Sequence, residues 1–304
     1  MKALFFWAGG EIPNLFKYCI ESFVKNGFET IVYSPEPDIN KNCLANDIDL
    51  RQSDEILPIE ILYKFKQRTP RNKPCYSAFS NLFRAKLIQA HPGSWYFDTD
   101  VFCIANATAF ENLISQSKDQ LILGRQDNQS VNGAVLSASS KSVADNFVKS
   151  LFEYVESKNY VHDFGDFGPA FLNNFLSRFP QNIRQIDQNI FYPIHYGETN
   201  YFYDPDFLDN ARQKIDKAFC VHLWNECLSM ASVPINCPPP KSSLLYELMV
   251  KNIQFDSSYA LPKKTMKKLF YPAKWGLKKT INNIFPSMLY FIKRQFKKYY
   301  SKIS

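Results

Sequence analysis

Two carboxylates, Asp98 and Asp100, lie inside the apolar run SWYFDTDVFCI at 94–104. The run predicts a buried strand, in which residues two apart face the same side. Two carboxylates side by side resist joint ionisation, and a divalent cation removes that conflict. Mg²⁺ and Mn²⁺ commonly bind one or two carboxylates together with the phosphate oxygens of a substrate. The pair therefore indicates metal-assisted chemistry on a phosphorylated substrate. A turn-capping Asp beside an ion-paired Asp is the alternative.

A second chemistry also uses two aspartates after a buried strand. In phosphatases that resemble haloacid dehalogenases, the first Asp is a nucleophile, and a Thr or Val is expected two residues after the second. Phe102 occupies that position here, and the motif lies about a third of the way along the chain. The sequence therefore favours metal binding over phosphatase chemistry.

The residues around the pair alternate between strand-like and helical patterns. The segments 2–8 and 29–35 read as buried strands, and the apolar residues of 14–27 have helical spacing. This order predicts a βαβ unit in a parallel sheet. The segment 35–75 is expected to be irregular. Further helices are expected at 75–93, 142–157 and 167–179, and further strands at 94–104, 120–126, 132–139 and 218–226.

The composition is that of a globular protein. The chain has 304 residues, of which 45% are hydrophobic, and it has no apolar run of about 18 residues that could cross a bilayer. The apolar stretch at its start is too short for a signal-peptide core. Its 7 cysteines are scattered without C-x-x-C spacing, which indicates neither a zinc ribbon nor a disulfide framework. We therefore expect a cytoplasmic protein.

The basic charge is concentrated at the C-terminus. Residues 261–304 contain 12 of the 36 Lys and Arg residues and none of the 29 Asp and Glu residues, so 1–260 have a net charge of −5. The acidic body gives no reason to expect nucleic acid.

The segments 266–285 and 288–303 predict two basic amphipathic helices divided by Pro286. Such helices are typical of an anchor lying in the plane of an anionic membrane surface, and packing on the body is the alternative. The prolines at 238–240 mark a boundary, so we expect a catalytic domain at 1–240 and a C-terminal extension at 241–304.

The stretch 77–101 resembles the sugar-binding DXD region of retaining glycosyltransferases, especially glycosyltransferase family 32. It is also similar to capsular-polysaccharide and α-1,4-galactosyltransferase-like enzymes. Ser80, Arg84 and Tyr96 match the pattern together with the two aspartates, while Asn81 and Ser94 replace the usual Asp and Gly. Further matches follow in order over residues 1–235: Trp7 and the rest of 7–13, Asn132 with Gly133, Gly168 with Pro169, and His222 with Trp224, Asn225 and Glu226.

The resemblance implies a GT-A-like, Rossmann-type α/β fold with a mixed central sheet. It also implies a metal-dependent, retaining hexosyltransferase that uses Mn²⁺ or Mg²⁺. The donor would be a nucleotide-diphospho-sugar, with a UDP-sugar favoured. The acceptor would be a glycan or glycolipid in the synthesis of capsule, lipopolysaccharide or a related surface polysaccharide. With the basic tail, this predicts a peripheral protein on the inner face of the cell membrane. A non-catalytic, membrane-associated sugar-nucleotide-binding protein is the alternative.

The resemblance also assigns site residues. The metal ligands are Asp98, Asp100 and His222, unless His222 is an ordinary histidine at a strand end. Asp166 joins the two aspartates as a catalytic candidate, in competition with Asp127, Asp163 and Glu226. Arg84 would pair with Asp98 or with the donor, and Trp7 and Trp224 would stack on base or sugar or pack in the core. The donor-binding residues are Trp7, Asn81, Arg84, Asp98, Asn132, Gly133, His222 and Trp224.

Overall fold

A computed structural model of the chain describes residues 1–67, 75–163, 165–230, 238–253, 255–263 and 265–266. The two predicted tail helices, apart from Met266, lie outside these residues, as does Cys237.

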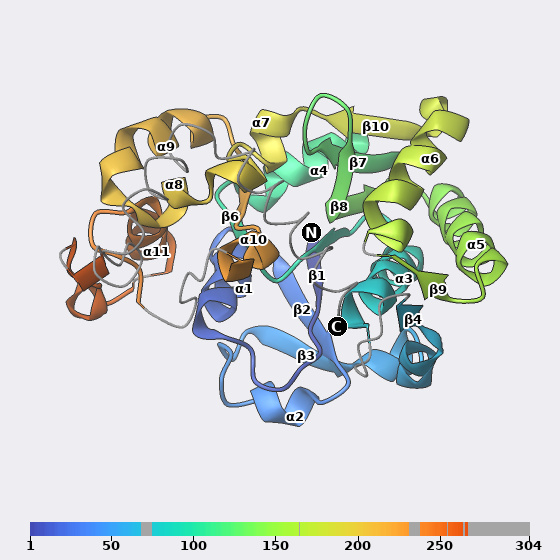
Figure 1. Ribbon diagram of the computed structural model, residues 1–304, viewed down its shortest axis with the longest axis horizontal. Helices are drawn as coiled ribbons and strands as arrows, with labels where there is room; N and C mark the ends of the chain where they lie inside the picture. The colour runs from blue at the N-terminus through green and yellow to red at the C-terminus, as the bar shows by residue number, and fades with distance from the viewer. Residues whose placement is uncertain (68–74, 164, 231–237, 254, 264, 267–304) are drawn as a thin grey trace, which may run out of the picture.

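A seven-stranded sheet forms the centre of the molecule (Figure 1), in the order β10-β7-β8-β5-β1-β2-β3. β8 runs antiparallel to its neighbours β5 and β7, and the other neighbouring strands are parallel. The expected mixed α/β fold is therefore confirmed. The strands are β1 (Lys2–Phe6), β2 (Glu29–Ser34), β3 (Ile48–Gln52), β5 (Trp95–Phe97), β7 (Leu121–Arg125), β8 (Val131–Ala138) and β10 (Ile183–Ile186).

Two smaller sheets flank the central one. β6 (Val101–Cys103) pairs antiparallel with β11 (Cys220–His222), and β4 (Lys66–Gln67) pairs parallel with β9 (Val161–His162). The single strand expected over 94–104 is therefore wrong, because it consists of β5, a turn and β6. Asp98 N–H still donates to Ala134 in the main sheet at 2.8 Å, whereas Val101 N–H turns back to Asp98 at 3.0 Å.

Helices cover both faces of the central sheet. They are α1 (Asn14–Lys25), α2 (Pro37–Asn40), α3 (Tyr76–Ala90), α4 (Ala107–Ser115), α5 (Lys141–Ser157), α6 (Phe171–Arg178), α7 (Gln188–Phe191), α8 (Asn200–Tyr203), α9 (Leu208–Ile215), α10 (Asn225–Met230) and α11 (Leu244–Ile253). A π-helical turn, Asp166–Ala170, leads into α6.

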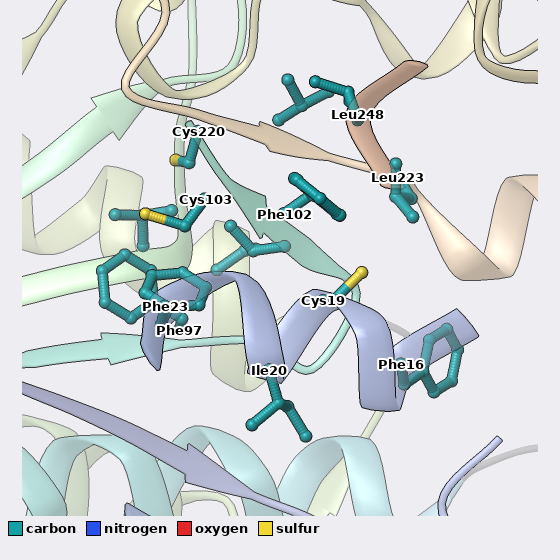
Figure 2. Packing of buried hydrophobic residues seen from close by; sticks show 14 of the residues in the cluster. Phe16, Cys19, Ile20, Phe23, Phe97, Phe102, Cys103, Cys220, Leu223 and Leu248 are labelled. Atoms are coloured by element: carbon teal, nitrogen blue, oxygen red, sulfur yellow. The ribbon is translucent and has the colours of Figure 1, made fainter. Parts of the chain in front are cut away.

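The side chains of β1 alternate between two hydrophobic cores, one on each face of the sheet. Ala3 and Phe5 belong to the core on the α1 side, whereas Leu4 and Phe6 belong to the core that contains α3 and α5 residues. A strand covered on both faces reads as a continuous apolar run rather than an alternating one. Figure 2 shows the first core, in which Cys19 and Phe23 of α1 face residues of β5, β6 and β11.

The sequence pattern does not predict several of the helices and strands. The segment expected to be irregular contains β3, which extends the sheet beyond β2. α4, β10 and the short helices α7 to α9 were not expected either. β3 has only one fully buried residue, Ile48, and β10 is 4 residues long, so both edge strands lack a long apolar run.

α11 is the main described part of the expected C-terminal extension. Its residues Leu244, Leu245, Leu248 and Met249 lie in the α1-side core. The division of the chain at residue 240 stays a prediction. Within the described residues, no helix combines the length and the apolarity needed to span a membrane.

Candidate active site

The turn between β5 and β6 brings Asp98 and Asp100 together with His222. One ligand atom from each of the three lies within 4.8 Å of the others. His222 ends β11, where it pairs with Val101, the first residue of β6. The β6–β11 pairing therefore places a late histidine beside two aspartates from the first third of the chain.

Asp100 is held by groups from the end of β11. Its Oδ1 lies 3.2 Å from His222 Nε2, and its Oδ2 accepts the Asn225 backbone N–H at 2.8 Å. Its backbone carbonyl accepts the N–H of Leu223 at 2.9 Å. Burial acts to raise the pKa of Asp100, but the charge and hydrogen bond of His222 and the Asn225 N–H outweigh it, so the pKa lies below 3.8. Asp100 is therefore an anion at neutral pH.

Asp98 is paired with an arginine of the fold. Its Oδ1 lies 3.0 Å from Arg84 Nη2 and accepts the Tyr96 hydroxyl at 2.6 Å. The Arg84 guanidinium also lies 4.9 Å from the centre of the Tyr96 ring. Burial acts to lower the pKa of Arg84, but the charge of Asp98 raises it overall. Arg84 thus contributes a partly buried, permanent positive charge beside the two aspartates.

β8 passes close to this arginine at Gly133. A Cβ at Gly133 would lie 3.2 Å from both Arg84 Nη1 and Leu172 Cδ1. The neighbouring Asn132 bonds within the β7–β8 hairpin, because its Nδ2 donates to Gln126 at 2.7 Å and its Oδ1 accepts Ala134 N–H at 2.7 Å. The Asn-Gly segment therefore lets β8 and α3 approach one another.

Asn81 joins α3 to the Asp166–Ala170 turn. A Cβ at Gly168 would lie 3.1 Å from Asn81 Oδ1, and Asn81 Nδ2 donates to the Ser77 carbonyl at 2.9 Å. This close approach leaves little room for a side chain at position 168.

Asp166 is engaged within its own loop. Its Oδ2 accepts the Asp163 N–H at 2.9 Å and lies 4.0 Å from Lys158 Nζ. Its competitor Asp127 accepts the N–H groups of Gln129 and Ser130 at 2.8 Å each. Neither belongs to the group formed by the two aspartates and His222.

The indole ring of Trp224 packs against the imidazole ring of His222. Its ring centre lies 4.1 Å from that of His222, and its Nε1 donates to the Ile194 carbonyl at 2.8 Å. Its φ of 57° is left-handed, a strained conformation for a bulky residue. Trp7 directly follows β1, and its Nε1 donates to the Gly10 carbonyl at 2.8 Å.

Sequence reasoning missed Tyr192. Its hydroxyl accepts the Val135 N–H at 3.0 Å and donates to the Asn132 carbonyl at 3.3 Å, and its ring lies 5.8 Å from that of His222. A Cβ at Gly124 would lie 2.5 Å from Tyr192 Cε2, so the glycine makes room for this ring. A glycine inside the apolar strand LILGR was the available signal.

One family model matches the chain. The region described as "Alpha 1,4-glycosyltransferase conserved region" matches residues 142–252. The matched part runs from α5 into α11 and includes Asp166, Gly168, His222 and Trp224, but not Asp98 or Asp100. No match was found among curated proteins.

Three solved structures are distantly similar to this chain. Mouse xyloside xylosyltransferase 1 in its apo form has 9% identity and a TM-score of 0.43, over 73% of this chain and 96% of the other. PaToxG glycosyltransferase has 11% identity and a TM-score of 0.42, over 91% and 86%. The apo structure of the bifunctional glycosyltransferase WbbM has 11% identity and a TM-score of 0.46, over 84% and 50%.

These three likenesses are too distant to assign a function. The match to the alpha 1,4-glycosyltransferase region supports a glycosyltransferase enzyme.

Proposed function

We propose that the chain is a metal-dependent, retaining glycosyltransferase that moves a hexose from a nucleotide-diphospho-sugar to a glycan acceptor. The observation that carries the proposal is the convergence of Asp98, Asp100 and His222, whose ligand atoms lie within 4.8 Å of one another. The family match supports the glycosyltransferase part of the proposal.

The donor set suits Mn²⁺ or Mg²⁺. Two carboxylates supply hard oxygen ligands, and an imidazole is a further ligand that Mn²⁺ accepts. Asp100 is ionised, and His222 Nε2 lies 3.2 Å from its Oδ1, so the two groups are close enough to contact one shared cation. When bound, the metal would supply positive charge that offsets the charge developing on the leaving diphosphate.

The contacts of Arg84 and Tyr96 with Asp98 suggest different roles for the two aspartates. Arg84 and Tyr96 both bind Asp98 Oδ1, which fixes the orientation of that carboxylate. We assign Asp98 Oδ2 to the metal or to a hydroxyl of the sugar or ribose, and Asp100 to the metal. The positive charge of Arg84 would also favour a diphosphate nearby.

The remaining assignments rest either on placement around this centre or on the resemblance. Trp224 contacts His222, and Gly133 contacts Arg84, so we place both beside the donor. Asn81, Asn132 and Trp7 are proposed donor contacts from the resemblance. Asp166 is proposed to face the sugar or the acceptor, because its turn contacts Asn81 through Gly168.

A UDP-sugar donor and an acceptor in capsule, lipopolysaccharide or a related polysaccharide are proposed from the resemblance. The basic residues of 261–304 support a peripheral position on the inner face of the membrane. Flotation of the full chain with anionic and with neutral liposomes tests that position. The chain should float with anionic liposomes but not with neutral ones. Recovery of the chain only at the bottom of the gradient in both cases would contradict the membrane position.

The reaction is tested with a panel of nucleotide sugars. Release of nucleotide should require Mn²⁺ or Mg²⁺ and should fall at least about 100-fold in Asp100→Asn. It should persist in the control Asp216→Asn, at an exposed position. If donors bind but no nucleotide sugar of the panel releases its nucleotide, with or without glycan acceptors, the result would favour the non-catalytic alternative. Retention is read from the anomeric proton of the product by NMR.

A further inference from the structure

Two cysteines lie directly opposite one another in the small β6–β11 sheet. Cys103 of β6 pairs in register with Cys220 of β11, although the two are 117 positions apart in the sequence. Residues that are directly opposite in an antiparallel pair point to the same face of the sheet. Figure 2 shows the two side chains next to one another in the α1-side core, where both have 0% exposure.

The backbone hydrogen bonds identify the kind of pair that the two cysteines form. Ile104 N–H donates to the Phe219 carbonyl at 2.9 Å, one residue along from the cysteines on each strand. Because such bonds alternate along antiparallel strands, Cys103 and Cys220 occupy a non-hydrogen-bonded position, and Cys103 N–H donates instead to Ser22 Oγ at 2.8 Å. The Cα atoms at such a position are typically about 4.5 Å apart, within the roughly 4.4–6.8 Å that a disulfide needs.

We propose that Cys103 and Cys220 are a dithiol that closes into a disulfide between β6 and β11 by exchange with a small-molecule disulfide such as oxidised glutathione. One cysteine thiolate attacks the S–S bond of the small disulfide, which releases one small thiolate and leaves a mixed disulfide on the protein. The second cysteine thiolate attacks the protein sulfur of that bond, so the protein S–S bond forms as the second small thiolate leaves. Two protein thiols are thereby oxidised, and one small disulfide is reduced to two thiols, which take up the two protons.

The contacts of the two thiols do not oppose this bond. Cys103 Sγ donates to the Ala105 carbonyl at 3.2 Å, and Cys220 Sγ donates to the Phe191 carbonyl at 3.8 Å. A thiol is a weak donor, so the loss of these two contacts costs little. Burial raises the pKa of both thiols, which keeps them protonated and unreactive while the sheet is closed. Exchange therefore takes place while β11 is loosened or still folding, and the strand pairing then brings the two sulfurs together.

The disulfide would fix the strand that carries His222. This histidine follows Cys220 by two residues and lies on the same face of β11. A disulfide stabilises a protein mainly by restricting its unfolded chain, and the effect grows with the length of the loop that is closed. The link between two such distant strands would therefore hold β11 against β6 under conditions that otherwise separate them.

Cys19 of α1 is the matched control. It lies in the same core with 0% exposure, and burial raises its pKa as well. It belongs to a helix, however, and no strand register places it opposite another cysteine. The comparison therefore isolates the effect of the register from that of burial.

The test is refolding of the full chain from urea in a mixture of reduced and oxidised glutathione. The remaining free thiols are then blocked with N-ethylmaleimide in urea, and the unreduced peptides are identified by mass spectrometry. The peptide pair joined through Cys103 and Cys220 should be at least about 10-fold more abundant than any pair joined through Cys19. It should disappear when the sample is reduced.

The urea midpoint of the oxidised chain should lie at least about 1 M above that of the reduced chain. Cys103→Ala and Cys220→Ala should each abolish this difference, whereas Cys19→Ala should preserve it. Absence of the Cys103–Cys220 peptide pair, its formation no more often than pairs with Cys19, or equal midpoints for the two forms would overturn the proposal. The peptide comparison uses the unmodified chain, so it remains decisive if a variant folds poorly.

Discussion

Nε2 of His222 lies 3.2 Å from Oδ1 of Asp100. Asp100 directly precedes β6, which pairs antiparallel with β11, the strand that ends at His222. This contact completes the candidate metal site, because Asp98 approaches from the other end of the same turn.

Metal affinity should depend on both members of the contact. Asp100→Asn and His222→Gln each remove a ligand while keeping similar shape, so Mn²⁺ affinity should fall at least about 10-fold. Titration of free Mn²⁺ by electron paramagnetic resonance measures it. Asp127→Asn is the matched control, because Asp127 bonds within its own loop and should leave the affinity unchanged. Unchanged affinity in both ligand variants would exclude this site.

Acid should lower the free energy of unfolding of the metal-free protein by protonating Asp100. Its pKa is lowered in the folded state, so its contribution to the free energy of unfolding is fully present above pH 3.8 and is lost as the pH falls further. Thermal unfolding in a chelator, from pH 6 to pH 3, should show a steeper loss below pH 4 in the unmodified chain than in Asp100→Asn. Parallel curves for the two proteins would contradict the lowered pKa.

Arg84 should matter for folding as well as for substrate. Arg84→Ala leaves the partly buried Asp98 without its cationic partner, so the free energy of unfolding should fall by about 1–3 kcal/mol. Urea unfolding at neutral pH measures the change. Arg178→Ala, at an exposed position at the end of α6, should change it by less than about 0.5 kcal/mol. A similar, small effect at both positions would mean that the Asp98 pair contributes little.

Gly124 should be intolerant of any side chain. In Gly124→Ala the new methyl group would meet the Tyr192 ring at 2.5 Å, and overpacking of this kind lowers the free energy of unfolding by about 1–3 kcal/mol. Because Tyr192 packs against His222, Mn²⁺ affinity should fall as well.

A double-mutant cycle separates the clash from other effects of Gly124→Ala. Combining it with Tyr192→Leu should cost less than the sum of the two single changes, as measured by urea unfolding. Strict additivity would show that Gly124 and Tyr192 do not compete for space.

The sequence predicted the βαβ unit because the buried strands at 2–8 and 29–35 are long apolar runs and α1 has a clear helical spacing. It failed at 94–104 because residues on both sides of the turn are equally buried. Nothing in a continuous apolar pattern reveals that β6 leaves the main sheet to pair with β11.

The candidate site divides in the same way. Asp98 and Asp100 could be proposed from local spacing, and His222 only from a resemblance, since its position depends on a strand pairing. Tyr192 and Gly124 were missed because they meet through the packing of α7 on β7.

The pairing of β6 with β11 also has a consequence for the order of events during synthesis. The two aspartates leave the ribosome more than 100 residues before the strand that carries His222. Contacts so distant in sequence form late, because the intervening chain must first be ordered. A growing chain could thus assemble β1, α1 and β2 early and still be unable to hold a cation through all three groups until β11 has emerged and docked.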